Sequence, residues 1–147
     1  MMDIYNQILA ALSTGLDGLY PDVPIYTEWV PDQLPAHCFL IGFAGDVSVI
    51  NELGGRLKVS GQLDIAYLPP EKTEESEIKK ELNGVFAAVS LQLRQLSYSG
   101  LTLKLQSHTR HDDGDELHDL CDFTTFLYPV DDTPKIKNID IDKEALK

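Results

Sequence analysis

The residues best suited to chemistry lie together between positions 108 and 119. His108, His111 and His118 occur there among five carboxylates. Imidazole and carboxylate groups are ligands that Zn²⁺ and Mn²⁺ accept, so this segment could serve a small metal-dependent hydrolase. Its spacing, however, matches neither the helical H-E-x-x-H pattern nor an EF-hand loop. We therefore favour a solvated hairpin tip, predict no metal site and no cofactor, and keep the hydrolase as an alternative.

Signals for other catalytic chemistry are missing from the sequence. It contains no G-x-S-x-G elbow, no Walker A loop and no G-x-G-x-x-G turn. Cys38 and Cys121 each lie inside an apolar run, which is typical of buried thiols in a reducing compartment rather than of a disulfide. Trp29, the only tryptophan, is either a core side chain or an interface anchor, and a ligand-binding adaptor would use it in the second way. We predict no catalytic residue and no enzymatic activity.

Hydrophobic periodicity indicates the elements that must position these residues. Apolar residues four apart predict a helix over residues 3–19, which Asp3 caps and Pro21 ends. Residues 23–30 are expected to form an edge strand, because Pro24 cannot donate to a ladder. Residues 37–44 are apolar on both faces, as in a covered central strand. Residues 45–55 are loop-like, and residues 56–68 alternate between an apolar and a polar face.

The second half of the chain completes the expected fold. A long helix is predicted over about residues 73–96, followed by a hairpin over residues 101–128 whose turn is Asp112–Asp115. The order α-β-β-β-α-β-β predicts an α+β fold, with a mostly antiparallel, mixed sheet of about five strands and two helices on one face. Residues 1–128 then form one domain. The charged residues 129–147 form a tail that is flexible or becomes ordered on a partner.

Composition limits the classes of partner. The 147 residues include 24 acidic and 12 basic side chains, a formal net charge of -12, and half of this charge lies within residues 111–122. Such an excess of acid argues against a broad basic surface that grips nucleic-acid phosphates. No apolar stretch is long enough to span a membrane, and the first residues lack the pattern of a signal peptide. We expect synthesis in the cytoplasm and no membrane partner.

An ordered set of short motifs runs through most of the chain. In chain order they are Pro21–Tyr26 (PDVPIY), Glu28, Gln33, His37–Ile41 (HCFLI), Leu53–Arg56 (LGGR), Leu63–Pro69 (LDIAYLP) and the glutamates that begin at Glu74. In this order the motifs resemble those of the phage tail terminator, or tail-completion, family of long-tailed phages and prophages of Gram-positive bacteria. The resemblance covers about residues 1–128.

That resemblance implies a structural virion protein without active-site chemistry. Tail terminators form a ring, usually a hexamer, that caps the head-proximal end of the tail tube, stops its polymerisation and joins the tail to the head-completion proteins. The implied partners are further copies of the chain, the tail tube protein and a neck protein, while DNA passes through the lumen without specific binding. The protein would be assembled in the host cytoplasm and reside in the virion tail. Another head–tail connector, such as a neck or stopper protein, is the alternative.

Contacts in such an assembly usually lie on loops that a rigid scaffold positions. We therefore predict interface residues in three places: at the tryptophan, in the loop over residues 45–55 and at the hairpin tip. The candidates are Trp29, Asp46, Asn51, Glu52, Asp112, Asp113, Asp115 and Glu116. The acidic tip is expected to face either the DNA channel, where it would repel phosphates, or a basic partner ring.

Overall fold

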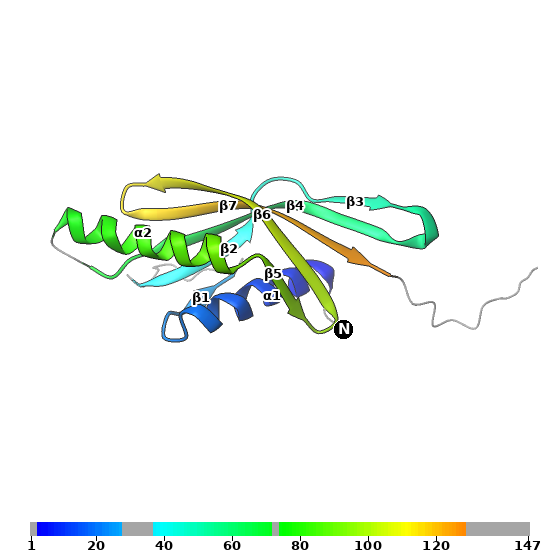
Figure 1. Ribbon diagram of the computed structural model, residues 1–147, viewed down its shortest axis with the longest axis horizontal. Coiled ribbons are helices and arrows are strands. Elements are labelled where there is room, and N and C mark those ends of the chain that lie inside the picture. The colour runs from blue at the N-terminus through cyan, green and yellow to red at the C-terminus, as the bar shows by residue number, and fades with distance from the viewer. Residues whose placement is uncertain (1–2, 28–36, 72–73, 129–147) are drawn as a thin grey trace, which may run out of the picture.

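The computed structural model describes residues 3–27, 37–71 and 74–128 (Figure 1). One curled sheet contains the strands of these residues, and both helices lie on the same face of it. In chain order the elements are α1 (Ile4–Leu19), β1 (Ile25–Tyr26), β2 (Cys38–Phe43), β3 (Ser48–Asn51), the 3-10 turn η1 (Leu53–Gly55), β4 (Leu57–Leu68), α2 (Glu75–Gln92), β5 (Gln95–Tyr98), β6 (Leu101–Asp113) and β7 (Glu116–Leu127).

The sheet runs in the order β1-β2-β4-β7-β6-β5, and β3 pairs with β4 beside this path. Strands β1 and β2 are parallel, and the remaining pairs within the described residues are antiparallel. The predicted α+β class, with a mostly antiparallel, mixed sheet, is therefore confirmed. The expected strand count and order are wrong, because the described residues form seven strands rather than about five.

Two short strands account for this difference. Residues 45–55, expected to be a loop, contain β3 and η1. The second helix ends at Gln92 rather than near residue 96, because residues 95–98 pair with β6 as β5. Ser99 and Gly100 join β5 to β6, and both have the positive φ that a type I′ hairpin turn requires. The edge strand expected over residues 23–30 is confined to Ile25–Tyr26 in the described part, and residues 28–30 lie outside it.

The first helix begins where the sequence predicts. The Asp3 carboxylate accepts a hydrogen bond from the backbone N–H of Asn6 at 2.9 Å, so Asp3 is the N-cap of α1. Ile8, Leu12 and Leu16, spaced four apart, are fully buried. This spacing puts them on one stripe of the helix, and that stripe packs on the sheet.

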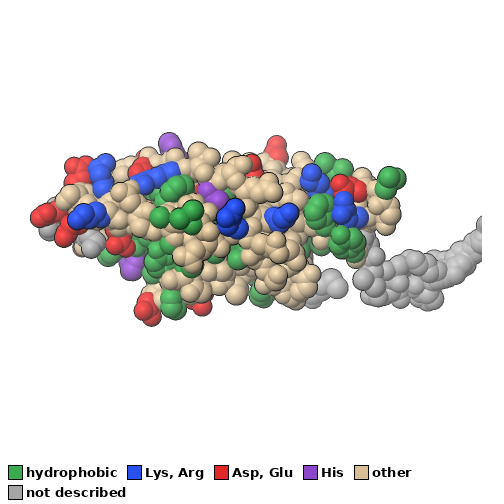
Figure 2. Space-filling view, viewed as in Figure 1, with side chains coloured by type: hydrophobic (Ala, Val, Ile, Leu, Met, Phe, Trp, Pro, Cys, Tyr) green, Lys and Arg blue, Asp and Glu red, His purple; other side chains and the backbone are tan. Residues whose placement is uncertain are grey.

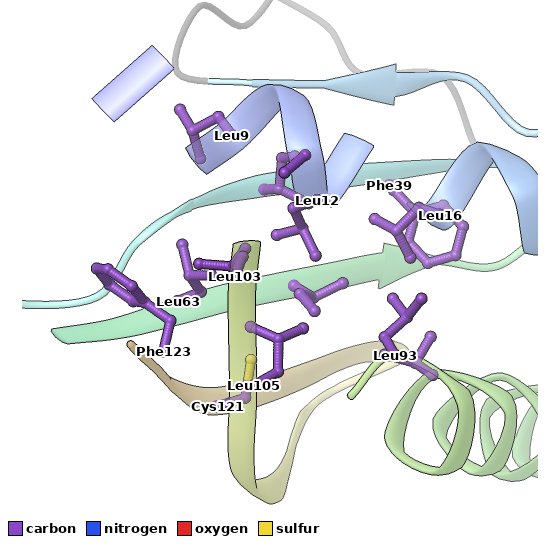
Figure 3. Packing of buried hydrophobic residues seen from close by; sticks show 14 of the residues in the cluster. Leu9, Leu12, Leu16, Phe39, Leu63, Leu93, Leu103, Leu105, Cys121 and Phe123 are labelled. Carbon is purple, nitrogen blue, oxygen red and sulfur yellow. The ribbon is translucent and has the colours of Figure 1, made fainter. Parts of the chain in front are cut away.

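One apolar core fills the space between the helices and the inner face of the sheet (Figure 3). The residues that Figure 3 labels are each at most 4% exposed. They come from α1, from the C-cap of α2 and from the strands β2, β4, β6 and β7. They are Leu9, Leu12, Leu16, Phe39, Leu63, Leu93, Leu103, Leu105, Cys121 and Phe123. A single core of this kind explains why the described residues form one unit.

Strand β4 joins the helix-covered body to a projecting hairpin. Its residues 63–68 pair with β2, and its residues 57–60 pair with β3 along the same edge. Its other edge pairs with β7 over eleven residue pairs, from Leu57↔Leu127 to Tyr67↔Leu117. Strand β3 pairs with the part of β4 that lies beyond the end of β2. The β3–β4 hairpin therefore extends away from the helices (Figure 1).

A polar contact fastens α2 to the sheet. The Tyr67 hydroxyl donates a hydrogen bond to Oε2 of Glu81 at 2.6 Å and lies 2.9 Å from Nε2 of His37. Tyr67 is only 1% exposed. Burial, followed by the hydrogen bond and charge of Glu81, raises the pKa of this hydroxyl, so it remains a donor.

Two predictions from composition can also be compared with the structure. Cys38 and Cys121 are both buried thiols, as the apolar runs around them indicate. Within the described residues, neither helix has the length and apolar character needed to cross a membrane.

Candidate functional site

The β3–β4 hairpin ends in an exposed apolar surface. All four residues of β3 are exposed. Val49 and Ile50 are each 50% exposed, and Leu53 in the turn is 99% exposed. Tyr128, directly after β7, is 68% exposed and follows the residue that pairs with the start of β4. We call Val49, Ile50, Leu53 and Tyr128 the hairpin patch, in which Val49 and Ile50, as successive residues of β3, face opposite sides of the hairpin. Large exposed apolar side chains gathered at one end of a molecule are candidates for contact with a partner.

Neighbouring contacts fix the shape of this end. The Arg56 guanidinium donates from Nε to Oε1 of Glu52 at 2.6 Å and lies 4.2 Å from the centre of the Phe126 ring. Gly54 and Gly55 have φ values of 83° and 81°, which only glycine adopts without strain. The exposed leucine is therefore presented on a defined turn rather than on a loose loop.

The hairpin end also differs in charge from the rest of the chain. Residues 47–60 contain one acid, Glu52, and two bases, Arg56 and Lys58, in a chain of net charge -12. Figure 2 shows hydrophobic side chains gathered at the right-hand end, over the β3–β4 hairpin, with basic side chains beside them. This end combines apolar surface with local positive charge.

The opposite end of the molecule is acidic. The β6–β7 turn lies within the predicted residues 112–115, and Asp113 and Asp115 are exposed there. Figures 1 and 2 show this turn at the left-hand end, beside the N-terminal part of α2, where acidic side chains are numerous. Arg110 ties the turn to α2: it donates to both carboxylate oxygens of Asp112 and, at 2.6 Å, to Oδ1 of Asn83. Its hydrogen bond lowers the pKa of Asp112.

The structure separates His108 from the other two histidines of the hydrolase alternative. His118 lies on the outer face of the sheet, 3.0 Å from Asp64 and 3.4 Å from Glu116. Burial opposes the charge of His118, but these two carboxylates outweigh it and raise its pKa. The ring centre of His111 is 6.4 Å from that of His118 on the same face. His108 instead points inward, because it bonds the residue after His118 in the strand, and successive residues face opposite sides.

The cysteines likewise do not provide a nucleophile. Burial raises the pKa of the Cys38 thiol, and burial together with nearby carboxylates raises that of Cys121. Both groups are therefore protonated near neutral pH, whereas nucleophilic cysteines are thiolates in exposed, electropositive surroundings.

Six of the eight predicted interface residues lie at the two ends of the molecule. Asn51 and Glu52 lie at the hairpin end, and Asp46 is exposed in the connection that precedes β3. The four acids from Asp112 to Glu116 lie at the acidic end. Trp29 lies outside the described residues. Whether these residues form contacts stays a prediction, and so does the division into a domain over residues 1–128 and a tail over residues 129–147. The whole of that tail lies outside the described residues.

Sequence reasoning missed the apolar surface of the hairpin. The signal was present, since Val49, Ile50 and Leu53 are large apolar residues in a segment otherwise rich in glycine and polar residues. Apolar side chains in a loop-like segment with no amphipathic period are candidates for exposure to a partner.

The described residues thus form a small α+β fold with exposed apolar residues at one end and exposed acidic residues at the other. The chain belongs to the phage tail terminator family: the family model described as phage tail terminator protein matches residues 4–135. Proteins of this family are structural components of the virion tail and interact with other tail and head-proximal proteins. No curated protein matches the chain. One solved structure covers 85% of this chain and 97% of its own at 13% identity and a TM-score of 0.44, a likeness too distant to bear on the fold.

Proposed function

We propose that this protein is the ring-forming subunit of a tail terminator. The ring, a hexamer as the family resemblance suggests, caps the head-proximal end of the tail tube, stops tube polymerisation and joins the tail to the head-completion proteins. Beyond family membership, the observation that supports ring formation is the pair of unlike ends, one apolar and basic, the other acidic.

A cyclic ring needs two different surfaces on each subunit. In a closed ring of identical chains, one surface of each copy contacts a different surface of the next, which is a heterologous contact. The hairpin patch with Arg56 and Lys58 offers one such surface, and the acidic residues of the β6–β7 turn offer a charge-complementary one at the other end. We propose that the hairpin end of one copy contacts the acidic end of its neighbour.

The exposure of the apolar and charged residues indicates how much each contributes to the free energy of the contact. Leu53 is 99% exposed, so covering it contributes about 1.5–3 kcal/mol of hydrophobic free energy. An exposed ion pair contributes at most about 1 kcal/mol. The apolar patch is therefore the main source of affinity, whereas the charges set the orientation and the choice of partner.

The apolar contribution can be tested by light scattering at several protein concentrations. Leu53→Glu places a charge on the most exposed residue of the hairpin patch and is expected to leave only monomer at concentrations where the native protein forms rings. Leu91→Glu is the matched control, because Leu91 is 70% exposed on α2 and lies outside the patch. If Leu53→Glu assembles like the native chain, the hairpin patch is not the contact surface.

The head-to-tail arrangement has a separate test with reversed charges. One variant combines Arg56→Glu with Lys58→Glu, and the other combines Asp113→Lys with Asp115→Lys. Each variant alone would bring like charges together at the contact, whereas a mixture restores opposite charges at every contact. We expect assembly only in the mixture; assembly of the Asp113/Asp115 variant on its own would remove the acidic end as the acceptor.

Tail length tests the terminator function itself. Electron microscopy of particles assembled without this protein should show overlong or headless tubes, and supplying the native chain should restore the normal length. Tails of normal length in its absence would contradict the function, whatever surface forms the ring.

The acidic net charge of the subunit also fits a lumen through which DNA passes without binding, because like charges repel phosphates.

A further inference from the structure

An irregularity in β6 turns His108 toward the core. Gln106 pairs with Asp122 and Thr109 pairs with Leu120, so Ser107 and His108 together oppose a single residue of β7. This is a β-bulge, which re-aims side chains and often occurs near functional sites. Ser107 has a φ of 55°, a conformation that costs free energy in a residue other than glycine. The strained bulge places His108 on the inner face beside β7.

Both ring nitrogens of His108 have partners. Nε2 lies 3.2 Å from the backbone oxygen of Leu93 at the end of α2, and Nδ1 lies 2.6 Å from Oδ2 of Asp119. Because a carbonyl oxygen only accepts, Nε2 donates its hydrogen there. Nδ1 and the carboxylate must then share either a proton or a metal ion, since two lone pairs at this distance would repel. A histidine that donates one N–H to a backbone carbonyl is the usual arrangement of a metal ligand.

Only one oxygen of the Asp119 carboxylate is hydrogen-bonded within the described residues. Asp119 is 1% exposed, and its Oδ1 has no hydrogen-bond partner within the described residues. A buried carboxylate oxygen without a partner is costly and rare in native proteins. Cys121 lies two residues further along β7, on the same face, and is fully buried in the core (Figure 3). Ligand atoms of His108, Asp119 and Cys121 all lie within 4.8 Å of one another.

We propose that His108, Asp119 and Cys121 bind a divalent transition-metal ion, for which Zn²⁺ is the best match. Zn²⁺ accepts imidazole nitrogen, carboxylate oxygen and thiolate sulfur together, in tetrahedral geometry. These three donors fill three of the four tetrahedral positions. The ion replaces the proton on Nδ1 and the thiol proton of Cys121, so both protons are released on binding. The site lies in the core and stabilises the fold, and it does not depend on the proposed ring.

The metal site requires only a local adjustment. Ligands of tetrahedral zinc lie roughly 3–4 Å apart, so the 2.6 Å contact between His108 and Asp119 must widen by about 1 Å. The apolar residues around the site, among them Leu105, exclude water and strengthen the electrostatic attraction of the ion for its ligands. This site uses one of the three histidines of the hydrolase alternative together with a cysteine that the alternative lacks, and it revises the prediction that the chain holds no metal.

The competing occupant of this contact is a proton alone, which would make His108 an imidazolium paired with Asp119. A proton shared between these two residues involves no sulfur, whereas a metal held by all three does. The decisive readout is therefore a signal from Cys121.

Cobalt titration of the full chain, freed of metal by dialysis against a chelator, supplies that readout. Co²⁺ is the probe, because a thiolate bound to it gives a sulfur-to-cobalt charge-transfer absorption that protonated thiols do not give. We expect one equivalent per chain, loss of the absorption in Cys121→Ser and its retention in Cys38→Ser, the matched buried cysteine. Zn²⁺ should displace the Co²⁺ and raise the melting temperature of the native chain.

Asp119→Asn provides a second variant in case Cys121→Ser folds poorly. It preserves the side-chain shape and is expected to weaken Co²⁺ binding at least about tenfold. Circular dichroism of the metal-free variants checks that they are folded. Absence of the absorption in the native chain, or its persistence in Cys121→Ser, would overturn the proposal and leave the proton as the occupant.

Discussion

Replacing Tyr67 with phenylalanine tests whether a single hydroxyl fastens α2 to the sheet. The substitution keeps the ring, which packs 5.0 Å from the ring of Phe39, and removes only the oxygen that donates to Glu81 and contacts His37. Tyr67 is 1% exposed, so water cannot take the place of the lost oxygen without rearrangement of the core. The perturbation is therefore confined to the polar contacts of one hydroxyl, of which the one to the charged Glu81 is the stronger.

The expected loss follows from the kind of hydrogen bond that is removed. A hydrogen bond to a charged group contributes about 1.5–3 kcal/mol. Glu81 is half-buried and recovers part of its hydration, which places the loss in the lower half of this range, at about 2 kcal/mol. For a chain of this length, that corresponds to a fall in melting temperature of about 4–8 °C.

The assay is urea unfolding of the native chain and of Tyr67→Phe. If the slope of the free energy of unfolding against urea concentration is the same for both, the two proteins differ in stability and not in the surface that unfolding exposes. Tyr98→Phe is the control, because Tyr98 is half-buried and its hydroxyl makes no hydrogen bond within the described residues. A double-mutant cycle with Glu81→Gln isolates the coupling between the two side chains. A loss below about 0.5 kcal/mol would refute the reasoning, since the free energy of the charged hydrogen bond would then be absent.

Three further predictions concern other parts of the fold. Asp3→Ala removes the N-cap of α1 and should lower the free energy of unfolding by about 1 kcal/mol in a urea titration, whereas an unchanged value would show that the cap is dispensable. Gly61→Ala places a Cβ 3.0 Å from the Phe123 ring and should destabilise by about 1–3 kcal/mol, measured by thermal unfolding; a more stable variant would contradict this close approach. The pKa of Asp112 is lowered by Arg110, so their pair stabilises the fold above the ordinary pKa of the carboxyl and loses this effect as the pH falls through the lowered value. The stability difference between the native chain and Arg110→Gln, below about 1 kcal/mol, should therefore shrink on acidification from about pH 6 to pH 3, and a constant difference would be evidence against the pair.

The parts of the fold that the sequence predicts well are those with a strong local signal. The cap at Asp3, the four-residue spacing in α1 and the alternation along residues 57–68 each reflect chemistry confined to a few neighbours. The predicted helix overran its end because Leu96 fits the helical period, yet the backbone around it pairs with β6. Tertiary pairing overrode local propensity there, which periodicity alone cannot reveal.

The candidate sites depended on features without a local signal. The bulge at Ser107 turns the side chain of every later residue of β6 to the face opposite the one that simple alternation predicts. The residue types around Ser107 do not indicate a bulge. The contact between His108 and Asp119 could therefore not be predicted. The acidic turn was predictable, because turn residues and charges are visible in the sequence, whereas the exposure of Leu53 depends on how far the hairpin projects.

The long pairing of β4 with β7 has a mechanical consequence. A pull on the projecting hairpin along its strands would act in shear on the interstrand hydrogen bonds of all eleven residue pairs at once, from Leu57↔Leu127 to Tyr67↔Leu117. Bonds stressed together in shear resist rupture far better than bonds opened one after another from an end. The same strand also contributes buried residues to the core between the sheet and the helices, so tension on the tip is transmitted along β4 to that core. A subunit built in this way is stiff along its long axis, the direction in which neighbours joined end to end would pull on one another.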